Sequence, residues 1–153
     1  TYSCVVPLRA GAQLAGADPT MVGHLEKIGT SVGLSFQLMD DDLGVFGDPD
    51  VTGKSVLSDL RAGKRTELLR LGFQYADEEG LAILRTMVGG PELDDAGATR
   101  VREVLLASGA RDRALRVARQ HMRTARRTAS ERVSAPLSGY LTALIDSLEE
   151  RTS

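Results

Sequence analysis

Two adjacent aspartates, Asp40 and Asp41, stand at the end of an apolar helical pattern, and two lysines, Lys54 and Lys64, follow in the next stretch of chain. Adjacent carboxylates repel one another, and the C-terminal end of a helix disfavours negative charge, so the pair is best explained by a bound cation. Magnesium suits it, because this ion takes one or two protein carboxylates and completes its shell with phosphate oxygens and water. The residue types therefore predict a site that holds a diphosphate through a divalent metal.

Helix geometry indicates which of the acids share a face. Successive residues are rotated by about 100°, so residues four apart lie on one side and residues two apart lie on nearly opposite sides. Asp40 then aligns with position 44, where this chain has Gly44. Asp42 points roughly 200° away from Asp40, so we expect a solvated charge there and no third metal ligand. Gln37 lies one turn before Asp41 and is expected on the side of the acids.

The elements that position these residues are predicted to be helices, and no stretch indicates a strand. Asp18 and Pro19 supply a helix cap and a first-turn proline. Apolar residues then recur at helical spacing, and they are Leu25, Ile28, Val32, Phe36, Met39 and Leu43. Further helices are predicted over residues 66–76, 79–88 and 95–108. The irregular segment 47–65 carries both lysines, and functional residues concentrate in loops of that kind.

The C-terminal third combines an arginine-rich stretch, residues 111–132, with an apolar last helix. Eight arginines against two acids could serve a nucleic-acid or membrane surface, but a solvated helix is the stronger interpretation because one narrow side carries small residues for packing. The residues of this stripe are Leu115, Ala118, Met122, Ala125 and Ala129. His121 and His24 are interpreted as surface or boundary residues. The last helix has one continuous apolar face, made by Leu137, Tyr140, Leu141, Leu144, Ile145 and Leu148.

Composition limits the classes of function. With 153 residues, 42% of them hydrophobic, the chain is long enough for one domain, and its formal charge of -2 argues against a general nucleic-acid binder. Charged residues interrupt the apolar stretches, so we expect no membrane span and no signal peptide. The only cysteine, Cys4, cannot form an internal disulfide; it is interpreted as a buried apolar side chain and fits a reducing, cytoplasmic location.

Taken in order, the residues around the aspartate pair resemble the second aspartate-rich region of the trans-isoprenyl diphosphate synthases, also called polyprenyl synthetases. The matching residues are Phe36-Gln37, Asp40-Asp41, Gly47-Asp48, Gly53-Lys54 and Gly63-Lys64-Arg65-Thr66. So many elements in order over about 30 residues make a more specific signal than one short motif. The stretch from Leu43 to Pro49 is most similar to actinobacterial short-chain members such as geranylgeranyl diphosphate synthases.

The resemblance implies an all-α fold, the C-terminal part of an isoprenoid-synthase helical bundle. Residues 1–153 would be a single partial domain, the C-terminal half of a polyprenyl synthetase domain, because the family's first aspartate-rich motif lies upstream of a Lys-Thr pair that Thr1 would complete. The chain alone is then expected to be incomplete and inactive. We expect it to form a homodimer or to bind a complementary N-terminal portion.

The activity that the resemblance implies is a Mg2+-dependent transfer in isoprenoid biosynthesis. An allylic diphosphate would lose its diphosphate, and isopentenyl diphosphate would attack the resulting carbocation and then lose a proton. The residues that carry this would be the metal ligands Asp40 and Asp41, the diphosphate-binding lysines Lys54 and Lys64, and the assisting amide of Gln37. Lys54 would act in catalysis together with the two acids. Phe36 would lie beside the prenyl chain, although its helical spacing alone predicts a core residue.

Two departures from the family pattern leave other functions open. Gly44 stands where many members have a third aspartate, and Leu57 stands where relatives usually have glycine. A non-catalytic or regulatory homologous subunit is therefore one alternative, and a terpene cyclase, which shares the helical architecture and the magnesium chemistry, is another. The segment from Gly47 to Ser55 also looks like a nucleotide-binding loop, but five residues separate its glycines where that motif needs four.

Overall fold

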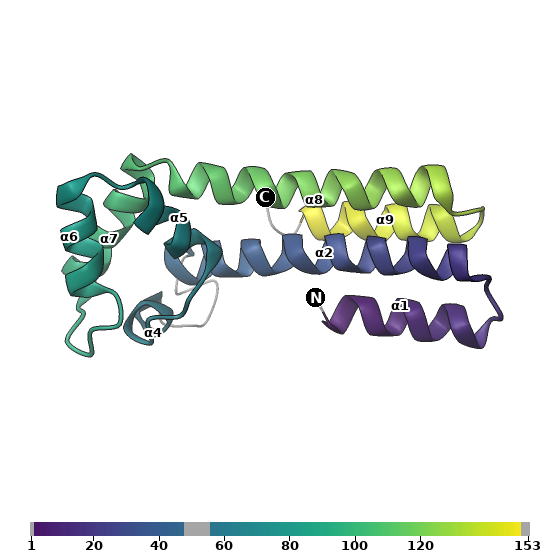
Figure 1. Ribbon diagram of the computed structural model, residues 1–153, viewed down its shortest axis with the longest axis horizontal. Coiled ribbons are helices and arrows are strands. Elements are labelled where there is room, and N and C mark those ends of the chain that lie inside the picture. Colours follow the sequence, from purple (N-terminus) through teal and green to yellow (C-terminus); the bar gives the residue numbers. More distant parts are fainter. Residues whose placement is uncertain (1, 48–55, 151–153) are drawn as a thin grey trace. The chain divides into compact units, whose positions relative to one another are not determined.

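The computed structural model describes residues 2–47 and 56–150, and the described residues form helices without any strand (Figure 1). The helices are α1 (Tyr2–Leu14), α2 (Pro19–Phe46), α4 (Val56–Arg61), α5 (Glu67–Tyr75), α6 (Glu78–Met87), α7 (Asp95–Ala107), α8 (Ala110–Arg132) and α9 (Leu137–Glu150). The prediction of an all-α fold is confirmed. In these same ranges, no helix combines the length and the apolar character that a membrane span requires.

The chain divides into two compact units. The first contains the residues up to 37 and those from 117 onward, and the second contains residues 38–116. The helices α2 and α8 contribute residues to both units, because the boundaries fall inside them. Each unit has its own hydrophobic core. The expectation of a single partial domain over residues 1–153 stays a prediction.

In the first unit, α1, α9 and parts of α2 and α8 surround one core. The buried residues of this core are Ala12, Leu25, Ile28, Val32, Met122, Ala125, Ala129, Val133, Leu141 and Ile145. Leu25, Ile28 and Val32 of the α2 pattern and Met122, Ala125 and Ala129 of the α8 stripe therefore point inward as predicted, whereas Leu43, later in the α2 pattern, is 43% exposed. The stripe differs at one position, since Ala114 is buried and Leu115 is only half-buried.

These helices also show features that the sequence patterns do not predict. The helix α1 forms around an internal proline, Pro7, which ordinarily interrupts a helix and hides its pattern. The apolar face of α9 is only partly covered, because Tyr140 is 73% exposed. Phe36 is 50% exposed, so its spacing with core residues does not bury it. Cys4 is half-buried against the first core.

The second unit is built from α4, α5, α6 and α7, with the last turns of α2 and the first turns of α8. Three of its helices begin with a side chain that accepts a hydrogen bond from an otherwise unpaired backbone N–H. These pairs are Thr66 with the Leu69 N–H (3.1 Å), Asp77 with the Gly80 N–H (2.8 Å) and Asp94 with the Gly97 N–H (2.8 Å). The helix α4 lies inside the segment that the sequence predicts as irregular, because Leu57 packs against the core and Leu60 is fully buried.

Candidate functional site

A buried carboxylate and a lysine meet where α2 ends. Only 5% of the Asp41 side chain is exposed, and the Lys64 Nζ lies 3.0 Å from its Oδ1 atom. The same Nζ lies 3.2 Å from Oδ2 of Asp59 on α4. We call Asp41, Asp59 and Lys64 the aspartate–lysine cluster. The hydrogen bond to Asp41 raises the pKa of Lys64 above its ordinary value; partial burial opposes this rise and Asp59 adds to it.

A tight turn after α4 brings Lys64 to this position. Gly63 has a φ of 59°, in the left-handed region that favours glycine. A Cβ at Gly63 would lie 3.2 Å from the Cα of Gly89, a tight approach that would push the backbone at Gly89 away. The backbone N–H of Lys64 donates to the Asp59 carbonyl at 3.2 Å. The turn therefore closes directly on the helix that carries the second carboxylate.

Asp42 is not the solvated charge that helix rotation predicts. It is 6% exposed, and its carboxylate accepts hydrogen bonds from Nε and Nη2 of Arg111 at 2.8 and 3.0 Å. Such paired contacts are the strong geometry for arginine and a carboxylate, and they raise the pKa of Arg111. The Arg111 guanidinium also lies 4.1 Å from the centroid of the Phe46 ring. The far side of α2 faces the start of α8 here, and so Asp42 is paired and buried.

A second arginine donates a hydrogen bond to a backbone carbonyl at the end of α2. The Nε atom of Arg102, on α7, donates to the Val45 carbonyl at 2.6 Å. The last carbonyls of a helix have no partner within it, and a cation there also favours the helix dipole. Sequence reasoning missed Arg102, Arg111 and Asp59. The signals were weak, because Arg111 is one arginine of a longer basic run and Asp59 is marked only by lying five residues before Lys64.

The structure brings together only part of the predicted site. Asp41 and Lys64 are in contact, whereas the Asp40 side chain is exposed on α2. Phe36 and Gln37 belong to the first unit and are exposed on the same helix. Lys54 lies outside the described residues. The metal, substrate and catalytic roles of these residues stay predictions.

The chemistry of the cluster agrees with a cation-binding role. Two carboxylate oxygens from separate helices converge on the ammonium of Lys64, which shows that positive charge is stabilised here. Within residues 2–47 and 56–150, no group of three or more His, Cys, Asp or Glu side chains could hold a metal ion alone. Magnesium needs fewer protein ligands, because phosphate oxygens and water complete its shell. Asp40 is exposed, whereas Oδ1 of Asp41 is paired with Lys64, and the role of both acids as magnesium ligands stays a prediction.

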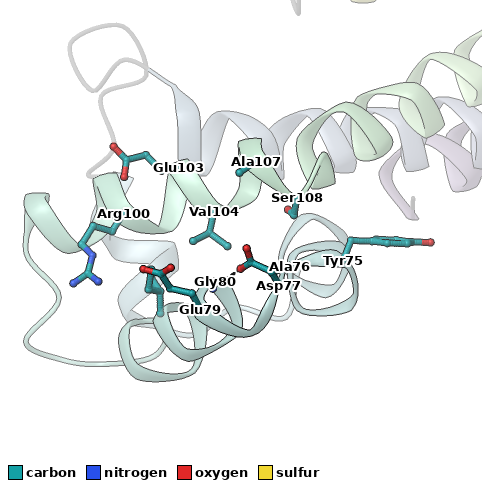
Figure 2. Close-up of a pocket in the computed structure, with 11 residues that line it drawn as sticks. Tyr75, Ala76, Asp77, Glu79, Gly80, Arg100, Glu103, Val104, Ala107 and Ser108 are labelled. Carbon is teal, nitrogen blue, oxygen red and sulfur yellow. Dashed lines mark hydrogen bonds between the residues drawn. The ribbon is translucent and has the colours of Figure 1, made fainter.

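A pocket of about 330 Å³ lies elsewhere in the second unit, beside α6 and α7 (Figure 2). Its lining includes three acids, Asp77, Glu79 and Glu103, and one arginine, Arg100. Figure 2 shows the Val104 side chain of α7 projecting toward Gly80 of α6. The surplus of carboxylates disfavours an anionic ligand, so this pocket is a poor candidate for binding a diphosphate.

Comparison with known proteins connects this geometry to a family. Residues 1–105 match the family described as Polyprenyl synthetase. The geranylfarnesyl diphosphate synthase of Aeropyrum pernix is 36% identical over 145 residues, which cover 94% of this chain and 44% of that protein. A (2E,6E)-farnesyl diphosphate synthase of Mycobacterium tuberculosis is 36% identical over 115 residues, which cover 73% of this chain and 32% of that protein.

Solved structures show the same similarity. A geranylgeranyl pyrophosphate synthase from Corynebacterium glutamicum, complexed with isoprenyl diphosphate and magnesium, has a TM-score of 0.88 and 33% identity. A polyprenyl synthase from Caulobacter crescentus, complexed with calcium and isoprenyl diphosphate, has a TM-score of 0.84 and 29% identity. Each match covers 98% of this chain, but only 43% and 46% of the respective solved chains. The chain thus spans less than half the length of the relatives it matches.

Proposed function

This chain belongs to the polyprenyl synthetase family, and from that premise we propose that the protein containing it is a prenyltransferase of isoprenoid biosynthesis. The reaction joins an allylic diphosphate head-to-tail with isopentenyl diphosphate and yields a longer prenyl diphosphate. The observation that supports this most directly is the contact of the buried Asp41 with Lys64 at the end of α2, within the acid- and lysine-bearing motif. A carboxylate and an ammonium in contact are the two kinds of group that would hold a metal-bound diphosphate, and this supports the proposal.

Some residues of this chain would bind the metal, and others would bind the diphosphate or the prenyl chain. Asp40 and Asp41 would hold magnesium, which when bound draws charge from the leaving diphosphate. Lys64 would donate to a diphosphate oxygen, as a compact positive charge suits phosphate, and Lys54 would add a second ammonium. The amide of Gln37 would assist in binding the diphosphate. The exposed ring of Phe36 would contact the prenyl chain and exclude water from the carbocation.

A partner and a cellular location complete the proposal. We propose that the region works within a homodimer or against a complementary N-terminal portion. Exposed apolar side chains support a partner, among them Tyr140 at 73% and Leu144 at 55% exposure on α9. We also propose a cytoplasmic location, which is supported by the single cysteine, Cys4.

A condensation assay on the full-length protein tests the function. The assay supplies isopentenyl diphosphate, an allylic diphosphate and magnesium, and the products are analysed after phosphatase treatment. Asp41→Asn should lower turnover by at least about 100-fold, the scale of losing a main electrostatic group. Glu67→Gln, which removes an exposed ion pair with Arg70 on α5, is the control and should retain activity.

The products also separate the two alternatives. A longer prenyl alcohol after dephosphorylation supports chain elongation, whereas a cyclic hydrocarbon would indicate a terpene cyclase. Gly44, in the place of a third aspartate, is the observation that favours a non-catalytic subunit. If the full-length protein makes no product but stimulates or binds an active homologue, the non-catalytic function is correct.

A further inference from the structure

Gly44 on α2 faces Asp59, the member of the aspartate–lysine cluster that lies on α4. A Cβ at Gly44 would stand 2.9 Å from Oδ2 of Asp59, closer than a carbon and an oxygen normally approach. This Oδ2 is the same atom that contacts the Lys64 Nζ at 3.2 Å. The space that a side chain at position 44 would occupy is therefore filled by a carboxylate that holds the lysine.

We propose that Asp59 is a positioning residue, which uses the space left by Gly44 to hold the ammonium of Lys64 beside Asp41. The identity of the ligand, a diphosphate, rests on the proposed function. The position of the Lys64 ammonium does not rest on the proposed function, because it is defined by the contacts among Asp41, Gly44, Asp59 and Lys64.

The exposure of the three charged side chains shows how the lysine can still reach a ligand. Asp41 anchors the ammonium on the buried side, because only 5% of its side chain is exposed. Lys64 and Asp59 keep 44% and 36% of their side chains exposed. An ammonium has three N–H donors, and the two carboxylates accept from two of them. Within residues 2–47 and 56–150 no further carboxylate pairs with Lys64, so the third donor can reach an oxygen of a ligand that approaches from solvent.

Holding the lysine in advance favours binding. A lysine side chain is long and flexible, so a lysine anchored at one point must lose rotamer freedom when it binds an anion. A second carboxylate on a separate helix removes much of that freedom before the ligand arrives, which is the usual gain from preorganisation. Gly44 leaves the room in which the Asp59 carboxylate makes this contact, although glycine is a poor residue inside a helix.

The test compares Asp59→Asn, Gly44→Ala and the double variant in the full-length protein. The first removes the charge that holds Lys64, and the second displaces the Asp59 carboxylate, which is the free end of a side chain and can move. Two readouts are used: hydrogen exchange of the Lys64 ammonium by 15N NMR, and the affinity for inorganic pyrophosphate with magnesium by calorimetry. Glu67→Gln is the matched control, because it removes the carboxylate of another exposed ion pair of the same unit.

Each single variant should speed ammonium exchange and weaken pyrophosphate binding by about tenfold, the scale of one charged hydrogen bond. The double variant should be no weaker than the more affected single variant, since both act through one contact. In the condensation assay, KM for the allylic diphosphate should rise more than kcat falls. A merely structural role would instead lower the folded fraction and leave the exchange rate unchanged in the folded protein.

The outcomes separate this inference from the proposed function. If pyrophosphate binds equally well to the parent and to Asp59→Asn, the positioning role is overturned while the proposed function stands. If pyrophosphate fails to bind the parent but both variants speed ammonium exchange, the positioning role is supported and the assigned ligand is wrong. Additive effects of the two substitutions would overturn the link between Gly44 and Asp59.

Discussion

The charge of Lys64 is shared between two carboxylates, and this has a consequence for the pH dependence of stability. Asp41, and after it Asp59, raises the pKa of the ammonium in the folded protein. A raised pKa means that the folded state binds the proton more tightly than the unfolded state does. The stabilising effect is therefore fully present below the ordinary lysine pKa of about 10.4 and is lost as the pH rises through the higher folded value.

We expect urea unfolding to show this loss only above about pH 10. The comparison is between the parent chain and Lys64→Met, each measured from pH 7 to pH 11. The difference in unfolding free energy between them should be constant up to the ordinary lysine pKa and should then shrink. A difference that grows with alkaline pH would show that the pKa of Lys64 is lowered in the folded protein.

Asp42 and Arg111 provide a second prediction at the level of residues. Asp42→Ala leaves a partly buried guanidinium without its bidentate partner, so we expect a loss of about 2 kcal/mol in unfolding free energy. Glu131→Ala, at an exposed position late in α8, should change it by less than about 0.5 kcal/mol. Chemical denaturation measures both. Equal, small effects of the two substitutions would restore the interpretation of Asp42 as a solvated charge.

Among the elements, the last turn of α2 depends on contacts from later helices. Val45 is 2% exposed and belongs to the core of the second unit, and its carbonyl accepts the hydrogen bond from Arg102 on α7. Arg111 at the start of α8 holds the same turn through Asp42 and lies over Phe46. A helix end that would otherwise fray is thereby fixed, and Asp41 with it.

Arg102→Met should loosen this helix end. The substitution keeps most of the apolar stem and removes the donor to the Val45 carbonyl, so we expect a loss of about 1 kcal/mol. Amide hydrogen exchange should accelerate in the last turn of α2 and remain unchanged in α5. The control is Arg100→Met, an exposed neighbour on the same helix. Unchanged exchange in α2 would show that the cap contributes nothing to its order.

For the whole molecule, the exposed apolar side chains are the property that most affects behaviour in solution. On α9, Tyr140 and Leu144 are 73% and 55% exposed, and Leu14 at the end of α1 is 90% exposed. Large apolar side chains that gather on a surface commonly mark an interface. The chain spans less than half the length of its relatives, so such faces are where a complementary portion or a second copy could pack.

We expect the isolated 153-residue chain to associate at micromolar concentration and to lack condensation activity. Tyr140→Ser with Leu144→Ser should reduce the association, because the pair removes apolar area from a surface without touching the core. Sedimentation velocity measures the oligomeric state, and the condensation assay measures activity. A monomeric, active chain of this length would contradict the need for a partner.

Local sequence patterns determined much of what this chain is. The family could be identified from the aspartate pair, the Gly-Lys elements and their order, because a motif of nearby residues can be recognised without knowing the fold. Helical periodicity identified the buried side of α2 at Leu25, Ile28 and Val32. These features follow from rotation per residue and from side-chain type, which are properties of neighbours in sequence.

The tertiary structure decided how the charges are paired. Arg111 binds Asp42 across 69 positions of sequence, and Arg102 reaches Val45 across 57. Helix rotation predicts that Asp42 points away from Asp40, but it does not reveal that Arg111 lies beside Asp42. The Asp59 carboxylate on α4 likewise occupies the space beside Gly44 on α2, so this approach also depends on how two helices pack. A buried charge must find a partner, and which partner is near depends on how distant segments pack, a fact that no local pattern contains.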